Sequence, residues 1–233
     1  VTTGGALTDT NVITVPGTTT ITATGQVVDL DHTSNNFATI LFGSSTEAVA
    51  SVEVVDTNAI AIGASKSTGN FTVTAGDDVT NSGTVTVGGN LSVTTSASDG
   101  LINMGTLEVD GTIALATNGN GAATVVNDAA IEFAASTVGG ALSATATTGN
   151  VAQSGALTIT GVTTIAADSG NNIILDNTSN NFQAAVRITS GNNVTLVDAG
   201  AIDLGASTVS GTYAVTATAG GDITDSGVLA ITG

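Results

Sequence analysis

The 233-residue chain has 19 acidic residues against only two basic ones, Lys66 and Arg187, and its formal net charge is −17. Contacts to phosphate need Lys and Arg, so this balance argues against nucleic acid or an anionic membrane as a partner. The absence of cysteine rules out a disulfide scaffold and a thiolate metal site.

The composition favours many short strands. Hydrophobic residues make up 41% of the chain and charged residues 9%, which is unlike the low hydrophobicity and high charge of disordered chains. Thirty glycines punctuate stretches of β-branched residues, as in proteins built from short strands and turns. No apolar run approaches the ~20 residues of a membrane-spanning helix, so membrane insertion is not expected.

The chain repeats itself at a regular interval. Gly17, Gly89, Gly161 and Gly233 stand 72 residues apart, and each ends the same short sequence motif. Residues 1–17 are read as the end of a preceding repeat, and 18–89, 90–161 and 162–233 as three repeats of one continuous solenoid segment. The chain begins and ends at the same position within the repeat, and it has no signal peptide or initiator methionine. We therefore interpret it as a processed or excised part of a longer array.

Within the third unit a shorter pattern recurs, in which an aliphatic residue is followed by glycine five residues later and by another aliphatic residue after three more. It occurs at Ile165-Gly170-Ile173, Val186-Gly191-Val194 and Val215-Gly220-Ile223. The steps between successive starts are 21 and 29, and a step of 22 would complete the unit of 72. Their average of 24 suits one coil of three short strands with turns.

The alternation of apolar and polar residues is typical of strands, as in Leu157-Thr158-Ile159-Thr160. We therefore predict an all-β fold, a right-handed parallel β-helix (β-solenoid) with three coils per 72-residue repeat. The step of 29 is attributed to a longer loop at one corner. The aliphatic residues predicted to stack inside are Ile60, Ile131, Ile202, Val87, Ile159 and Ile231.

Two recurring phrases are predicted to form corners. Asn35-Asn36-Phe37 returns as Asn180-Asn181-Phe182, and we expect the phenylalanines to fill the core while the asparagines stack at a turn. The alternative is that Asn-Asn-Phe is an exposed recognition loop. The second phrase runs through all three units, at Ile60–Ser65, Ile131–Ser136 and Ile202–Ser207.

A string of antiparallel β-sandwiches is the competing fold. Such sandwiches usually carry a core tryptophan and more prolines in their linkers, whereas this chain has no tryptophan and one proline. The shorter pattern inside the third unit also has no reason to exist in a sandwich. The solenoid is therefore favoured.

The chain has few of the residues that catalysis needs, and we expect neither an enzyme nor a catalytic or cofactor-binding residue. His32 is the only histidine, and its equivalent in the third unit is Asn177. Lys66 aligns with Thr137 and Thr208, so it is not part of the repeat, and Arg187 is not either. Both cations are expected to be dispensable.

Asx-rich turns give the only metal candidates. Asp29, Asp31 and Asp176 carry oxygen ligands of the kind that calcium prefers. Asx residues that cap their own turns explain them more simply. The expectation is no cofactor and no dedicated metal site, with weakly bound calcium at these turns as the remaining interpretation.

The phrase from Val215 to Ile223, running on to Ser226-Gly227 and to Ile231-Thr232-Gly233, resembles the repeats of filamentous-haemagglutinin-like secreted proteins. Copies recur at 71–88 and 142–161. The resemblance implies a long right-handed parallel β-helix of the bacterial surface adhesin or fibre type. It covers nearly the whole chain and leaves any ligand open.

These observations predict a non-catalytic, extracellular or cell-surface segment that forms a fibre, stalk or filament. Its expected partner is itself, either head to tail or within a longer repeat array. The alternative is an adhesin that uses a Thr/Asn-rich face of the solenoid to bind glycan, a host surface or ice. Threonine-rich segments such as Thr18-Thr19-Thr20 could supply that face, but the matching threonines are not present in all three units.

Overall fold

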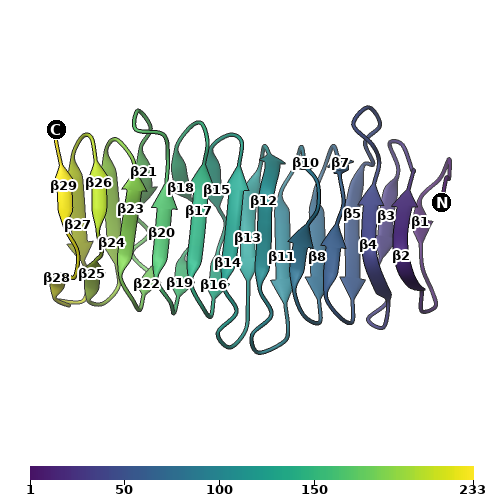
Figure 1. Ribbon diagram of the computed structural model, residues 1–233, viewed down its shortest axis with the longest axis horizontal. Coiled ribbons are helices and arrows are strands. Elements are labelled where there is room, and N and C mark those ends of the chain that lie inside the picture. The colour runs from purple at the N-terminus through teal and green to yellow at the C-terminus, as the bar shows by residue number, and fades with distance from the viewer.

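The computed structural model describes all residues from 1 to 233 and contains strands but no helix. The chain winds in the right-handed sense into a straight rod, and its two termini lie at opposite ends (Figure 1). Every pairing between neighbouring strands is parallel, from β1 on β3 to β26 on β29. The predicted parallel β-solenoid is therefore confirmed, and the antiparallel sandwich is wrong.

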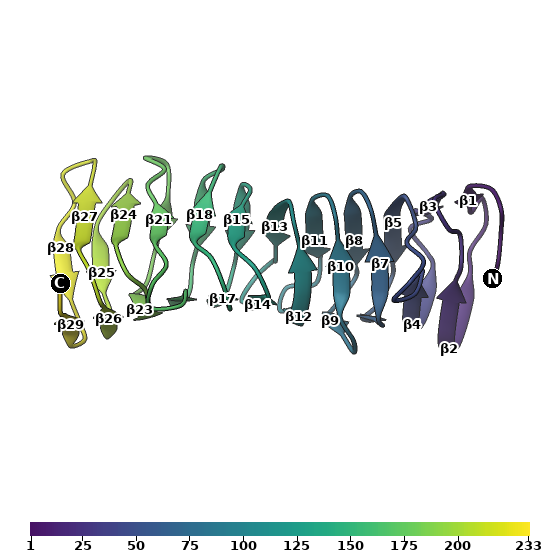
Figure 2. The same cartoon turned by 90° about the horizontal axis from the view of Figure 1, so that it is seen from above.

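Two long sheets run along the rod and appear as two rows when it is seen from above (Figure 2). Sheet 1 stacks, in this order, β1 (Leu7–Thr8), β3 (Val27–Leu30), β5 (Ser51–Asp56), β8 (Phe71–Ala75), β11 (Leu91–Thr95), β13 (Thr112–Ala116), β15 (Ile131–Phe133), β18 (Val151–Gln153), β21 (Ile173–Leu175), β24 (Val194–Asp198) and β27 (Tyr213–Ala217).

Sheet 2 lies on the opposite side of the core. It stacks β2 (Thr14–Ile21), β4 (Asn36–Phe42), β6 (Ile60–Ile62), β9 (Val79–Asn81), β12 (Ile102–Val109), β14 (Ala123–Asn127), β17 (Leu142–Ala146), β20 (Thr163–Ala166), β23 (Val186–Ser190), β25 (Ile202–Leu204) and β28 (Ile223–Asp225). Each sheet path thus has 11 strands, one for each coil.

A third short strand closes many of the coils, and it changes sides along the rod. β7 (Ser65–Ser67) and β10 (Val85–Val87) extend sheet 2 at the upper edge of Figure 1. The next three extend sheet 1 at the lower edge: β16 (Ser136–Val138), β19 (Leu157–Ile159) and β22 (Asn181–Phe182). The last two return to the upper edge and pair with each other: β26 (Ser207–Val209) and β29 (Leu229–Ile231).

This change of sides corrects the predicted number of coils. Phe71 on β8 and Tyr213 on β27 lie two units apart in the sequence, and seven steps of sheet 1 separate their strands. Their counterpart in the intervening unit, Leu142 on β17, belongs to sheet 2. One unit therefore occupies three and a half coils rather than three, and equivalent residues alternate between opposite faces.

The prediction of three coils per unit was wrong because the shorter pattern is unevenly spaced. Ile165 and Val186 lie on adjacent strands of sheet 2, so the step from one to the other is one coil. The longer step leads from Val186 on sheet 2 to Val215 on sheet 1, which is one and a half coils. No long corner loop is involved, and the three-coil expectation and the loop interpretation are both wrong.

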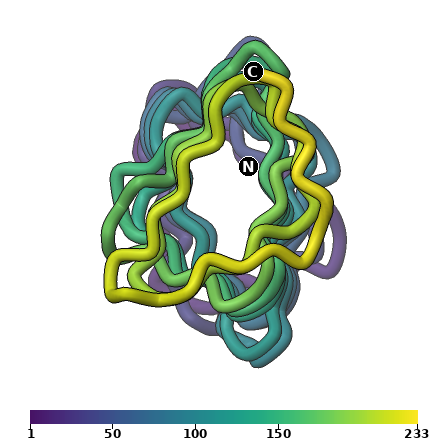
Figure 3. The backbone as a smooth tube through the Cα atoms, turned by 90° about the vertical axis from the view of Figure 1, so that its left-hand side faces the viewer, coloured from purple at the N-terminus to yellow at the C-terminus, as the bar shows by residue number.

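Side chains from all faces meet in one continuous core of 49 buried hydrophobic residues. Figure 3 shows, end-on, the coiled backbone that encloses this core. Ile60, Ile131 and Ile202 are buried as predicted, and so are Val87 and Ile159. Ile231 is 44% exposed, contrary to the prediction, because it lies in the last coil, where no further coil covers it.

Candidate functional site

Buried polar corners recur at the same place in each unit. Asp56, Asn127 and Asp198 occupy equivalent positions, each at the end of a strand, and none is more than 2% exposed. Each accepts a hydrogen bond from a backbone N–H of the coil before it: Phe37 to Asp56 (2.6 Å), Val109 to Asn127 (2.8 Å) and Phe182 to Asp198 (2.7 Å). These side chains hold successive coils together at a corner where the ladder is interrupted.

The Asn-Asn-Phe phrases form these same corners. Phe37 and Phe182 are buried, and Asn35 and Asn180 are fully enclosed. Asn35 donates to Asp9 Oδ2 (2.6 Å) and accepts from the N–H of Ile13 (2.8 Å). The prediction of core phenylalanines beside turn asparagines is confirmed, and the alternative of an exposed recognition loop is wrong.

The phrase that runs through all three units ends on a buried serine. Ser65, Ser136 and Ser207 each donate to a backbone carbonyl two residues earlier, at 2.9 to 3.0 Å. Each also accepts a backbone N–H from a neighbouring coil, at 3.0 to 3.1 Å. A small hydroxyl that both donates and accepts explains why serine ends this phrase in every unit.

The predicted calcium candidates do not come together. Asp29 and Asp31 lie in the second coil, whereas Asp176 follows β21, which is seven steps further along sheet 1 than β3. Burial raises the pKa of Asp29, and the neighbouring carboxylates of Asp31 and Asp9 raise it further. No group of three or more His, Cys, Asp or Glu side chains is arranged to hold a metal ion.

Lys66, Arg187 and His32 stand in separate places. Lys66 is the central residue of β7, Arg187 points outward from β23, and His32 lies in an exposed turn where its Nδ1 accepts the N–H of Ser34 (3.2 Å). No arrangement of a nucleophile with a base is formed among them. No helix long and apolar enough to cross a membrane occurs in the structure.

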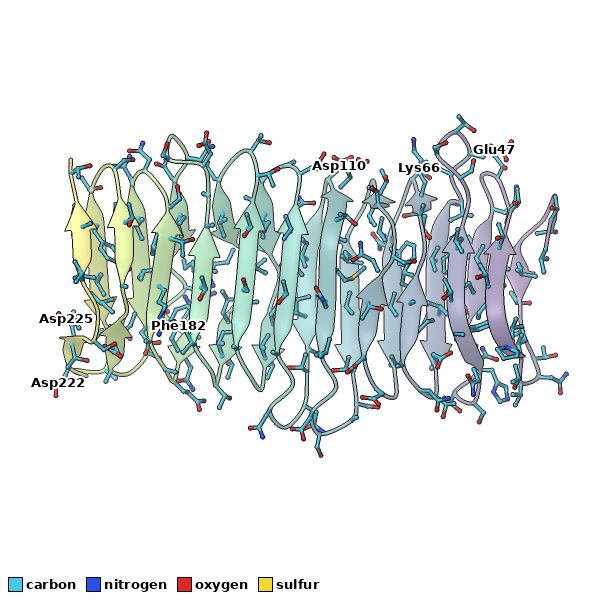
Figure 4. All side chains as sticks on the ribbon, in the orientation of Figure 1. Glu47, Lys66, Asp110, Phe182, Asp222 and Asp225 are labelled. Atoms are coloured by element: carbon cyan, nitrogen blue, oxygen red, sulfur yellow. The ribbon has the colours of Figure 1, made fainter.

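The most enclosed hollow on the surface lies beside Lys66, at the upper edge of the rod. Its volume is about 340 Å³, and its polar lining comes from four coils: Ser44, Ser45, Ser65, Lys66, Thr84, Thr86 and Glu108. Figure 4 shows Glu47, Lys66 and Asp110 along this same edge. Sequence reasoning missed the hollow, although one signal was present: Lys66 breaks the repeat.

Lys66, Thr86 and Glu108 form one outward column across the hollow. Lys66 pairs with Thr86 in the register of β7 and β10, and Thr86 pairs with Glu108 in that of β10 and β12. Thr86 Oγ1 donates to Glu108 Oε2 (2.8 Å). The register of β12 against β14 shifts between Met104 and Leu107. After this shift, β12 pairs with β10 at the upper edge of the rod.

Comparison with known proteins identifies a repeat family. The family described as repeats of unknown function (DUF5649) matches residues 1–42, 49–106, 120–189 and 191–233. The unmatched stretches are 43–48, 107–119 and residue 190. No curated protein matches the chain, and no solved structure matches it. With nearly the whole chain matched, the protein belongs to the DUF5649 family of repeats of unknown function.

Proposed function

We propose that this chain is a structural segment, a rigid rod that forms part of a fibre, stalk or filament on a microbial surface or in an extracellular matrix. One observation carries the proposal: the coils stack through two parallel ladders of 11 strands over a single unbroken core. Such a molecule lengthens by adding repeats, without a new fold and without a new core.

The chemistry of the surface supports a structural role. The hollow beside Lys66 is lined mainly by polar side chains, and the one histidine of the chain, His32, lies elsewhere. We therefore propose a non-catalytic protein that needs no cofactor. Its high negative charge favours solubility of a long repetitive molecule outside a cell. The resemblance to filamentous-haemagglutinin-like repeats supports the surface location.

Self-association is the proposed mode of extension, either within a longer repeat array or head to tail. Each coil pairs with its neighbours through parallel backbone ladders over one shared core, so coils of the same kind can stack on one another. The alternative role, an adhesin that binds glycan or a surface through its polar face, is compatible with the same rod.

The test is whether length follows repeat number. Residues 162–233 are duplicated in tandem, and rod length is measured by small-angle scattering and electron microscopy. Three and a half coils at ~4.8 Å each predict an increase of about 17 Å with no change in cross-section. A matched variant that carries a flexible Gly/Ser segment of equal length should not lengthen the rod. A compact particle whose length ignores the duplication would overturn the proposal.

The location is tested separately, on cells that produce the protein. Protease added to intact cells should degrade a surface fibre and spare an internal protein. Full protection of the chain in intact cells, with degradation only after lysis, would contradict the extracellular role. That result would leave the rod architecture unaffected.

A further inference from the structure

The hollow beside Lys66 is lined partly by residues that lie outside the family match or differ from those of the other units. Ser44 and Ser45 belong to the unmatched stretch 43–48, and Glu108 belongs to the unmatched stretch 107–119. Lys66 replaces the threonines found at positions 137 and 208. Two stretches outside the family match and one position that differs between the units thus meet around one cavity.

The loop that forms one wall is held in place by its own hydrogen bonds. Ser44 N–H donates to the Glu47 carbonyl (2.7 Å), and Ser44 Oγ accepts the N–H of Glu47 (3.1 Å). Gly43 adopts a φ of 74°, which favours glycine, and a Cβ there would collide with the Glu47 carbonyl. Val49 N–H then donates to the Lys66 carbonyl (3.0 Å), which ties the end of the loop to β7.

The opposite wall is held in place as well. The hydrogen bond from Thr86 to Glu108 orients the carboxylate, and one of its two oxygens, Oε1, remains free to accept from a ligand. Lys66 offers ammonium donors, and Ser45 and Thr84 offer hydroxyls that can donate or accept. The site therefore presents donors and acceptors together, and hydrogen bonds hold the Ser44 loop and the Glu108 carboxylate in position.

We propose that this hollow binds a short neutral saccharide. A saccharide offers hydroxyls that both donate and accept, which matches a lining of ammonium, carboxylate and hydroxyl groups. The volume of about 340 Å³ is at the lower end of the range for small-molecule sites. This binding role goes beyond the structural role proposed above and does not depend on it.

Other classes of ligand fit less well. Only one lining residue, Ala64, is hydrophobic, so an apolar ligand would leave the polar groups without partners. An anion would meet Lys66 but also Glu108, on a chain of net charge −17. A simple cation would face the Lys66 ammonium. A neutral polyhydroxylated molecule avoids all three conflicts.

The experiment is a titration of the whole chain, labelled with ¹⁵N, with cellotriose, maltotriose and triacetylchitotriose in turn at millimolar concentration. At least one should shift the amide signals of the hollow, at Ser44, Ser45, Lys66, Thr86 and Glu108. Lys66→Thr, which installs the residue of the other units, and Glu108→Gln should each weaken binding about tenfold, the usual loss when a charged hydrogen-bonding group is removed.

Matched controls remove the same charges elsewhere. Arg187→Gln on β23 and Glu132→Gln on β15 lie outside the hollow and should leave the affinity unchanged. Circular dichroism checks that all four variants keep the fold. Absence of shifts with all three saccharides, shifts confined to other faces, or shifts that persist in both Lys66→Thr and Glu108→Gln would each overturn the proposal. None of these outcomes would affect the length test of the rod.

Discussion

The backbone N–H of Phe37 donates to Asp56 Oδ2 at 2.6 Å, across two successive coils. The same bond joins Val109 to Asn127 and Phe182 to Asp198 in the other units. A carboxylate and an amide thus perform the same task at equivalent corners. What the corner requires is an acceptor oxygen, and a charge is not essential.

The first prediction follows from this equivalence. Asp56→Ala leaves the N–H groups of Phe37 and Asn58 without their acceptor and should lower the free energy of unfolding by about 1–3 kcal/mol. Asp56→Asn keeps one acceptor, and its new amide can donate as that of Asn127 does to the Ala130 carbonyl. Its cost, measured by urea unfolding, should be clearly smaller. Equal losses in the two variants would show that the corner depends on the charge.

The second prediction concerns pH. Burial raises the pKa of Asp56, although the hydrogen bonds from Phe37 and Asn58 lower it in part. At a pH between the unfolded and the folded pKa, Asp56 is therefore protonated in the folded chain and ionised in the unfolded chain. The contribution of Asp56 to stability is greatest below its unfolded pKa of about 3.9, and it is lost as the pH rises through the folded pKa.

Comparison with Asp56→Asn isolates this effect from the other carboxylates. As the pH falls from neutral towards the unfolded pKa, the wild-type chain should gain stability relative to the variant. Urea unfolding of both proteins over a series of pH values measures the difference. A relative loss on acidification would mean that the carboxylate is stabilised in the folded state, contrary to the direction inferred from its burial.

The third prediction concerns the turn between β13 and β14. Gly119 has a φ of 57°, and a Cβ at this position would collide with the Ser98 carbonyl of the preceding coil. Gly119→Ala should therefore lower the melting temperature, since both the backbone conformation and the close approach oppose a side chain. Gly170→Ala is the matched control, because nothing lies within 4 Å of its Cβ position. An equal effect of the two substitutions would contradict the packing of coils at this turn.

The fourth prediction concerns calcium. Asp29 and Asp31 repel each other, and Asp176 lies too far along the rod to join them. Calcium bound here should be weak, so chelation with EDTA should leave the melting temperature nearly unchanged, and Asp29→Asn should not alter that result. A fall of tens of degrees on chelation, absent in Asp29→Asn, would reveal a structural ion site.

The repeat in the sequence was sufficient to predict the fold class, the burial of Ile60, Ile131 and Ile202 and the corners built on Asn35 and Asn180, but these isoleucines alternate between the two sheets and do not stack on one another. It was not sufficient to count the coils, because residue spacing does not say on which face a residue lies. Val186 and Val215 carry the same local pattern, yet they lie on different sheets. The pattern of inward and outward residues is identical on both faces.

The hollow could not be found by aligning the units, because alignment highlights what the units share. Ser44, Lys66 and Glu108 are brought together only by the stacking of successive coils and by the register shift in β12. In the sequence, none of these residues on its own differs from an ordinary polar surface residue. Departures from a repeat become informative once the fold shows that they converge.

Cross-linking of paired cysteines tests the central claim, the coil register, most directly. Thr72 on β8 pairs with Ser92 on β11, both partly exposed on sheet 1, and the chain has no native cysteine to interfere. The longer coil implied by three coils per unit would instead place Thr72 beside Ser96. The double variant Thr72→Cys/Ser92→Cys should cross-link rapidly with a short thiol-specific reagent, and Thr72→Cys/Ser96→Cys should not. Efficient cross-linking of the second pair and failure of the first would contradict the register, and with it the three and a half coils of each unit.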